Sequence, residues 1–150
     1  MRRRPRGRPA ALIVYFDTSA LIKTVLEEEG SVIADELWAR ASARVASRLV
    51  YPEARAALAA AERSGRIDQA GRCTAAADLE AACTAMALLG VDWALAQHAG
   101  EIAEVYALRG YDAVHLATAL SVDDPDLVLL TWDGDLADAA VRAGRAVVPG

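Results

Sequence analysis

The fold of this chain is decided by a short apolar run that ends in an acid, Leu12-Ile13-Val14-Tyr15-Phe16-Asp17. A second run of the same kind lies near the other end of the chain, Leu127-Val128-Leu129-Leu130-Thr131-Trp132-Asp133. Continuous apolar runs of this length are typical of strands that are buried on both faces in a parallel sheet. Open parallel sheets bind ligands outside the carboxyl ends of their strands, so we expect Asp17 and Asp133 at that edge.

Strand and helix patterns alternate along the rest of the chain. The predicted strands are residues 12–16, 44–47, 127–131 and 145–148. The predicted helices are residues 18–26, 31–40, 51–64, 68–89 with an interruption near Asp78, 92–109 stopped by Gly110, 111–121 and 134–143. This order predicts a single α/β domain with three layers, in which helices surround a short central parallel sheet.

The charge is distributed unevenly between the first residues and the rest of the chain. Five of the 16 Lys and Arg residues stand in residues 1–9, which leaves 11 basic against 21 acidic residues, or about −10, in the remainder. Dense like charge with Pro and Gly predicts that residues 1–11 form a disordered arginine-rich tail before a folded domain at 12–150. An acidic body lacks the basic face of a generic nucleic-acid binder, so handling RNA or DNA would require metal ions in its site and local arginines around it.

Cysteine usage and hydropathy indicate a cytoplasmic protein without a membrane span. Cys73 and Cys83 fall in one predicted helix, about 15 Å apart at 1.5 Å per residue, too far to form a disulfide within that helix. Neither a disulfide framework nor a zinc spacing is present, which favours reduced thiols. No apolar run approaches the roughly 18 residues of a membrane span.

Two acids in the middle of the chain share one pattern of apolar neighbours. Apolar residues follow each acid at offsets +1, +4, +5 and +8: Ala54, Ala57, Leu58 and Ala61 after Glu53, and Ala113, Leu116, Ala117 and Leu120 after Asp112. This spacing places each acid in the first turn of a helix, at the border of its buried face. We therefore expect both carboxylates at the mouth of a cleft, where a cation would bind.

Each acid also has a purely structural interpretation. Asp17 and Asp133 are suited to cap the helices that follow them, and first-turn Glu53 and Asp112 are suited to complement a helix dipole. The four together favour convergence on one site over four independent caps.

Four motifs carry a resemblance to a known family. They are Val14-Tyr15-Phe16-Asp17-Thr18-Ser19-Ala20-Leu21-Ile22-Lys23, Tyr51-Pro52-Glu53-Ala54, Arg109-Gly110-Tyr111-Asp112-Ala113-Val114-His115-Leu116-Ala117-Thr118-Ala119, and Thr131-Trp132-Asp133-Gly134-Asp135-Leu136. In this order they resemble PIN-domain nucleases, specifically the VapC-type toxins of bacterial toxin–antitoxin pairs. Three features depart from the family: the arginine-rich tail, Gly110 where alanine is common, and two aspartates that compete for the fourth acidic position.

The resemblance implies a metal-dependent endoribonuclease with a PIN-like domain at residues 12–150. Asp17 and Asp112 are the expected direct ligands, and Glu53 and Asp133 complete the shell directly or through water. Carboxylate oxygens favour Mg²⁺ or Mn²⁺ over zinc. The secondary candidates are Asp135 as a substitute for Asp133, and Ser19 and Thr131 as residues that position water or substrate, with local capping as their alternative role. His115, like most single histidines on packed helices, is interpreted as structural rather than as a general base.

The resemblance also implies partners: an RNA substrate, a second copy of the chain, and a cognate antitoxin that covers the cleft and inserts an arginine among the carboxylates. The RNA target and the number of ions stay open. A response-regulator receiver domain is disfavoured because it needs a late lysine, and the only lysine is Lys23. The remaining alternative is a non-catalytic PIN-like module that binds RNA or protein, which the presence of all four acids disfavours.

Overall fold

The computed structural model describes residues 11–149, so the arginine-rich segment predicted to be disordered lies outside the described residues, apart from Ala11. The described residues form one five-stranded parallel sheet with the order β3-β2-β1-β4-β5. The strands are β1 Ile13–Phe16, β2 Ala43–Ser47, β3 Ala87–Leu89, β4 Val128–Leu130 and β5 Ala146–Val148. The predicted α/β class and the parallel sheet are confirmed.

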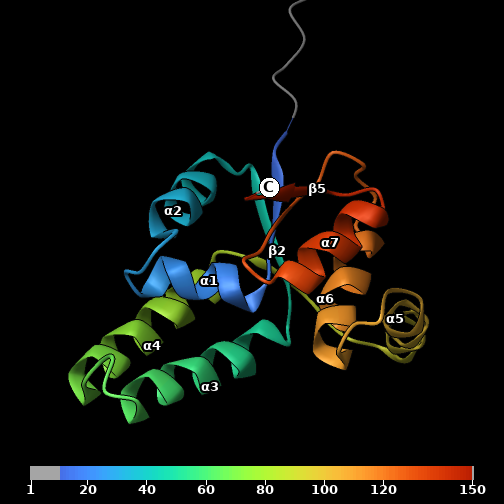
Figure 1. Cartoon of the computed structure of the whole chain (residues 1–150). Coiled ribbons are helices and arrows are strands. Elements are labelled where there is room, and N and C mark those ends of the chain that lie inside the picture. Colours follow the sequence, from blue (N-terminus) through green and yellow to red (C-terminus); the bar gives the residue numbers. More distant parts are fainter. Residues whose placement is uncertain (1–10, 150) are drawn as a thin grey trace, which may run out of the picture.

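Seven helices in the described residues cover the two faces of the sheet (Figure 1). They are α1 Thr18–Val25, α2 Ser31–Arg40, α3 Val50–Arg63, α4 Gln69–Thr84, α5 Trp93–Tyr106, α6 Gly110–Ser121 and α7 Gly134–Arg142. Helices α5, α6 and α7 pack on one face, around Tyr15 and Leu129. Helices α1 and α2 pack on the opposite face around Val14 and Phe16, which confirms the three-layer arrangement.

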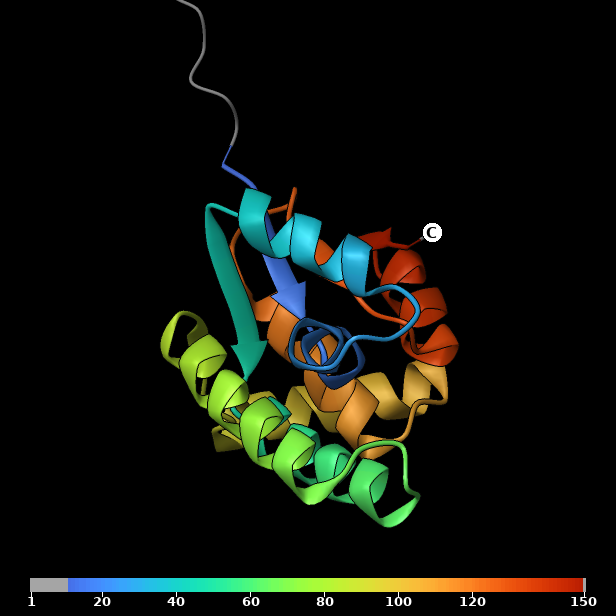
Figure 2. The same ribbon diagram turned by 90° about the vertical axis from the view of Figure 1, so that its left-hand side faces the viewer.

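The first apolar run forms the central strand of the sheet. Val14, Tyr15 and Phe16 of β1 are all fully buried, because side chains that alternate along the strand meet helices on both faces. Figure 2 shows β1 and β2 running side by side in the same direction, toward the end of the molecule where α3 and α4 lie. On the other side of β1, Phe16 is in register with Leu130 of β4. Asp17 and the residues after Leu130 therefore emerge at the same edge of the sheet.

The prediction of one interrupted helix over residues 68–89 is wrong in two respects. Helix α4 continues through Asp78 and ends at Thr84, where the N–H of Ala85 closes the last turn on the carbonyls of Ala81 and Ala82. Residues 87–89 then form β3, whose three residues pair with 45–47 of β2. A three-residue edge strand after an alanine-rich helix carries too little periodicity to be distinguished from that helix.

The prediction that Gly110 ends the preceding helix is also wrong. Helix α5 ends at Tyr106, and Ala107 adopts the left-handed conformation that more commonly belongs to glycine at such an end, with φ 54°. Arg109 is the extended residue before α6, and Gly110 is the first residue of that helix.

Both cysteines lie on α4 with free thiols, as expected. No helix within residues 11–149 is long and apolar enough to cross a membrane.

Candidate active site

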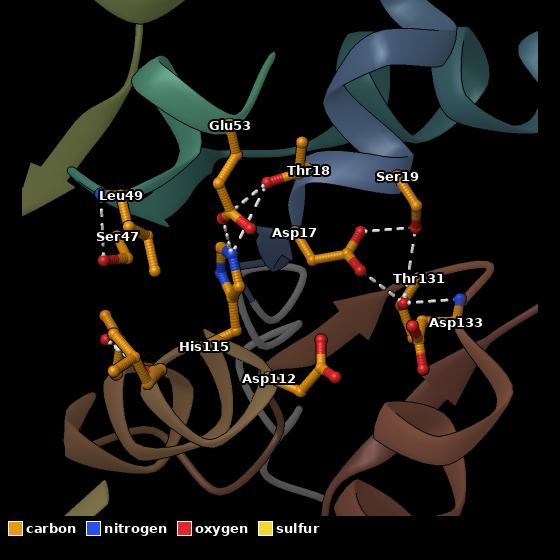
Figure 3. Close-up of polar contacts among 12 residues, drawn as sticks. Asp17, Thr18, Ser19, Ser47, Leu49, Glu53, Asp112, His115, Thr131 and Asp133 are labelled. Atoms are coloured by element: carbon orange, nitrogen blue, oxygen red, sulfur yellow. Dashed lines mark hydrogen bonds and ion pairs between the residues drawn. The ribbon is translucent and has the colours of Figure 1, made fainter. Parts of the chain in front are cut away.

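All four predicted acids line one pocket of about 380 Å³ at the carboxyl edge of the sheet (Figure 3). Asp17 follows β1 directly, and Asp133 follows β4 at the start of α7. Glu53 and Asp112 lie in the first turns of α3 and α6. The four segments are far apart in the sequence, and the parallel sheet brings them together. The competing acid, Asp135, is exposed and is not part of the pocket wall.

Asp17 is buried and surrounded by neutral hydrogen-bond donors. Its Oδ1 accepts from the N–H of Ala20 at 2.9 Å and from the hydroxyl of Ser19 at 2.7 Å, and its Oδ2 accepts from the hydroxyl of Thr131 at 2.5 Å. Burial raises the pKa of Asp17 above its ordinary value, although the hydrogen bonds from Thr131, Ser19 and Ala20 partly oppose that rise. Asp17 is therefore both the cap of α1 and a carboxylate held in one orientation.

Ser19 and Thr131 connect Asp17 to the loop between β4 and α7. The hydroxyl of Ser19 accepts from the N–H of Trp132 at 2.9 Å, and the hydroxyl of Thr131 accepts from the N–H of Asp133 at 3.0 Å. Both hydroxyls therefore join two segments that are far apart in the sequence, and their role in positioning water or substrate stays a prediction. Asp133 in turn caps α7, because its Oδ1 accepts from the N–H of Leu136 at 3.0 Å.

Glu53 is held by a buried chain of hydrogen bonds that begins at the sheet. The N–H of Ser47 donates to the hydroxyl of Tyr15 at 3.1 Å, and that hydroxyl lies 2.8 Å from Nδ1 of His115. On the other side of the ring, Nε2 lies 2.6 Å from Oε1 of Glu53, which also accepts from the hydroxyl of Thr18 at 2.9 Å. The interpretation of His115 as a buried, hydrogen-bonded residue is confirmed, and its 2% exposure excludes a freely solvated base.

Burial and hydrogen bonding shift the pKa values of Glu53 and Tyr15. Partial burial raises the pKa of Glu53, but the hydrogen bonds from His115 and Thr18 lower it below its ordinary value overall. Burial raises the pKa of Tyr15 far above its ordinary value, so its phenol stays neutral. Glu53 is thus a carboxylate near neutral pH, and Tyr15 retains a proton to donate.

Asp112 and Asp133 share a single cation that the sequence reasoning missed. Nε of Arg109 lies 2.8 Å from Oδ2 of Asp112, and its Nη2 lies 3.0 Å from Oδ2 of Asp133. The Arg109 side chain is 72% exposed, so water and salt reach this pair of contacts. The spacing of three residues before Asp112 was a visible signal for the first contact. The second contact spans 24 residues and depends on the fold.

The residues present fit a hard divalent cation by their chemistry. The four acids come from four different segments of the chain and offer carboxylate oxygens. Carboxylate oxygens are the ligands that Mg²⁺ and Mn²⁺ prefer. Within the described part of the chain, no three His, Cys, Asp or Glu side chains are already arranged to hold a metal ion. In this structure Arg109 pairs with one oxygen each of Asp112 and Asp133.

The comparison with known proteins agrees with this geometry. A family model described as the PIN domain matches residues 14–142. Ribonuclease VapC49 of Mycobacterium tuberculosis (strain ATCC 25618 / H37Rv) is 45% identical over 137 residues, which cover 91% of this chain and 95% of the relative.

Solved structures share the fold at lower sequence identity. PAE2754 from Pyrobaculum aerophilum superposes with a TM-score of 0.68 at 24% identity, over 95% of this chain and 88% of that one. VapBC-5 from Mycobacterium tuberculosis, described as a member of the VapBC family of toxin–antitoxin systems, gives a TM-score of 0.60 at 22% identity, over 93% and 98% of the two chains. The resemblance drawn from the four motifs is confirmed, and the chain belongs to the PIN-domain family, in its VapC group.

Proposed function

We propose that this chain is a metal-dependent endoribonuclease and the toxin of a toxin–antitoxin pair. The observation that carries the proposal is the convergence of Asp17, Glu53, Asp112 and Asp133 on one pocket. The 45% identical relative is a protein named as a ribonuclease, and it is matched over nearly its whole length.

In this proposal Asp17 and Asp112 hold Mg²⁺ or Mn²⁺ directly, and Glu53 and Asp133 complete the shell. When bound, such an ion polarises a phosphate oxygen, stabilises developing negative charge and lowers the pKa of water. The protein supplies fixed positions: the donors on Asp17 and Glu53 prevent either carboxylate from rotating freely. Preorganised charge of this kind costs no rearrangement when the reaction occurs.

Two cations on another wall of the pocket support RNA as the substrate. Lys23 and Arg66 both line the pocket and pair with Glu28, at 2.8 and 3.8 Å. The Lys23 ammonium also lies 4.9 Å from the ring centre of Trp132. These residues offer positive charge for the RNA backbone in a chain whose net charge is −5.

The proposal includes an antitoxin and a second copy of the chain. The position of Arg109 between Asp112 and Asp133 supports the expected arginine of an antitoxin, because it shows that a guanidinium fits between these acids. For a homodimer, the support is apolar surface on α5, where Trp93 is 77% and Val105 67% exposed.

RNA cleavage tests the catalytic part of the proposal. Purified protein is incubated with total RNA in Mg²⁺, in Mn²⁺ and in EDTA, beside Asp17→Asn and Asp112→Asn variants whose folding is checked by circular dichroism. We expect cleavage with either metal, none in EDTA, and almost none with the variants. Cleavage by both variants at the rate of the unmodified chain would refute the assignment, and RNA binding without cleavage would establish the non-catalytic module instead.

A further inference from the structure

A buried histidine behind Glu53 has no part in the chemistry proposed above. His115 lies on α6, one turn after Asp112, and its side chain is 3% exposed. Both of its ring nitrogens are within hydrogen-bond distance of a side chain from another element: Tyr15 of β1 and Glu53 of α3. Such a histidine can stabilise the core, or it can determine how the acid at its far end is oriented.

The hydrogen-bond partners determine which ring nitrogen carries the proton. The hydroxyl of Tyr15 accepts from the N–H of Ser47 and lies 2.8 Å from Nδ1 of His115. At the other end, the carboxylate of Glu53 only accepts hydrogen bonds, so Nε2 must be the donor across 2.6 Å. The carboxylate therefore determines the tautomer: Nε2 carries the proton, and the neutral ring has a bare Nδ1 that accepts from the hydroxyl of Tyr15.

This arrangement makes the two oxygens of Glu53 unequal. Oε1 accepts from Nε2 of His115 and from the hydroxyl of Thr18, which fills its two lone-pair directions. Figure 3 shows both contacts converging on the one end of the carboxylate. Oε2 is the oxygen left to accept a ligand in the pocket that Glu53 lines.

We propose that His115 is a positioning residue, with its proton on Nε2 and its Nδ1 accepting from Tyr15, that orients Glu53 so that Oε2 serves the cation of the acidic pocket. The role in cation binding rests on the proposed function, whereas the tautomer does not. The chain of contacts starts at a backbone N–H of β2 and crosses β1, so the register of the two central strands determines where Glu53 is held. Metal-site carboxylates and histidines commonly have such outer partners.

The tautomer is tested by ¹⁵N NMR of the imidazole nitrogens in the metal-free protein near pH 7.5. We expect Nε2 of His115 to carry the proton and Nδ1 to have the shift of an acceptor. In Tyr15→Phe we expect Nε2 to keep its proton, because Glu53 still requires a donor, and the Nδ1 signal to move to that of a nitrogen with no hydrogen-bond partner. A proton on Nδ1 in the unmodified chain, or an unchanged spectrum in Tyr15→Phe, would overturn the proposal.

Cation affinity tests the consequence for Glu53, measured as Mn²⁺ binding by calorimetry. His115→Leu removes the donor, and losing an outer partner of this kind weakens binding by roughly 10- to 100-fold. His115→Gln keeps an N–H donor at a similar reach, so we expect it to recover part of that loss. His98→Gln is the matched control, since His98 is exposed on α5, and it should bind Mn²⁺ as the unmodified chain does.

The outcomes separate this proposal from the proposed function. If His115→Leu is folded and binds Mn²⁺ as tightly as the unmodified chain, or if His115→Gln is as weak as His115→Leu, the positioning role is wrong. If the unmodified chain neither binds Mn²⁺ nor cleaves RNA, the proposed function fails, and the cation role of Glu53 fails with it. The ¹⁵N spectrum still decides the tautomer in that case.

Discussion

The two halves of the acidic pocket are built by different means. In the inner half, Asp17 and Glu53 are held by hydroxyl, imidazole and backbone donors close to the ends of β1 and β2. In the outer half, Asp112 and Asp133 share Arg109, whose side chain is 72% exposed. Partners that are themselves buried, such as His115 and Thr131, fix geometry, whereas ion pairs to the exposed side chain of Arg109 are weak and easily exchanged. The inner half is thus preorganised, and the outer half can exchange its cation.

The largest effect is expected in the inner half, from Asp17→Asn. A bound ion stabilises the charge of the transition state by several kcal/mol, and each ~1.4 kcal/mol is a tenfold change in rate. We therefore expect the cleavage rate to fall roughly a thousandfold. The measurement is single-turnover cleavage of a defined RNA in Mg²⁺. A loss of less than tenfold would show that the buried carboxylate is only a helix cap.

The same variant, Asp17→Asn, should lose activity but gain stability against unfolding. Because burial raises the pKa of Asp17, the folded chain binds a proton there more readily than the unfolded chain. That stabilising contribution is complete below the ordinary pKa of an aspartate and is lost as the pH rises through the raised value. Metal-free Asp17→Asn should therefore unfold at a higher temperature than the unmodified chain at pH 7.5, and the difference should shrink as the pH is lowered through that range.

The next effect distinguishes the two aspartates of the last motif. Asp133 lines the pocket, whereas Asp135 is exposed in the first turn of α7. We expect Asp133→Asn to lose about 10- to 100-fold in cleavage rate, as for a residue that supports the shell, and Asp135→Asn to change it by less than about twofold. Equal losses in the two variants would contradict the placement of the fourth acid.

A smaller effect is expected where the two halves meet, at Thr131. Thr131→Val removes the donor to Asp17 and the acceptor for the N–H of Asp133 with little change in volume. Leaving buried polar groups unpaired costs about 1–3 kcal/mol of unfolding free energy, and the pKa of Asp17 should rise further. Urea denaturation at pH 7.5 measures the first effect. A variant as stable as the unmodified chain would mean that water replaces the hydroxyl.

The smallest effect belongs to the outer half. Arg109→Gln removes the cation that competes for Asp112 and Asp133, so Mn²⁺ binding should tighten, by up to about fivefold at low salt. Screening should reduce the gain at high salt. Calorimetric titration at two salt concentrations measures both. Weaker binding in this variant would show that Arg109 supports the cation site instead of competing for it.

The positions of the four acids were predictable from the sequence, whereas most of the contacts that hold them were not. Asp17 and Asp133 were predictable because each follows a continuous apolar run, and parallel strands end at a common edge. Glu53 and Asp112 were predictable from the repeated spacing of apolar residues in their helices. These are local patterns, and each places an acid relative to its own element.

The misses depend on contacts that no local pattern contains. The contact of Tyr15 with His115 spans 100 residues, so the hydrogen bonds that orient Glu53 appear only in the folded chain. The short strand β3 and the helix end at Ala107 were missed because their residues, alanine and leucine, also favour helices. Pairing at a sheet edge and packing around the α5–α6 turn override that preference.

The claim that both halves serve one cation is tested most directly by a Mn²⁺ titration of three proteins. These are the unmodified chain, Asp17→Asn from the inner half and Asp112→Asn from the outer half, all metal-free at the start. We predict saturable binding to the unmodified chain and at least a tenfold weaker affinity in both variants. Binding that is lost in one variant and unchanged in the other, or absent from the unmodified chain, would contradict the account.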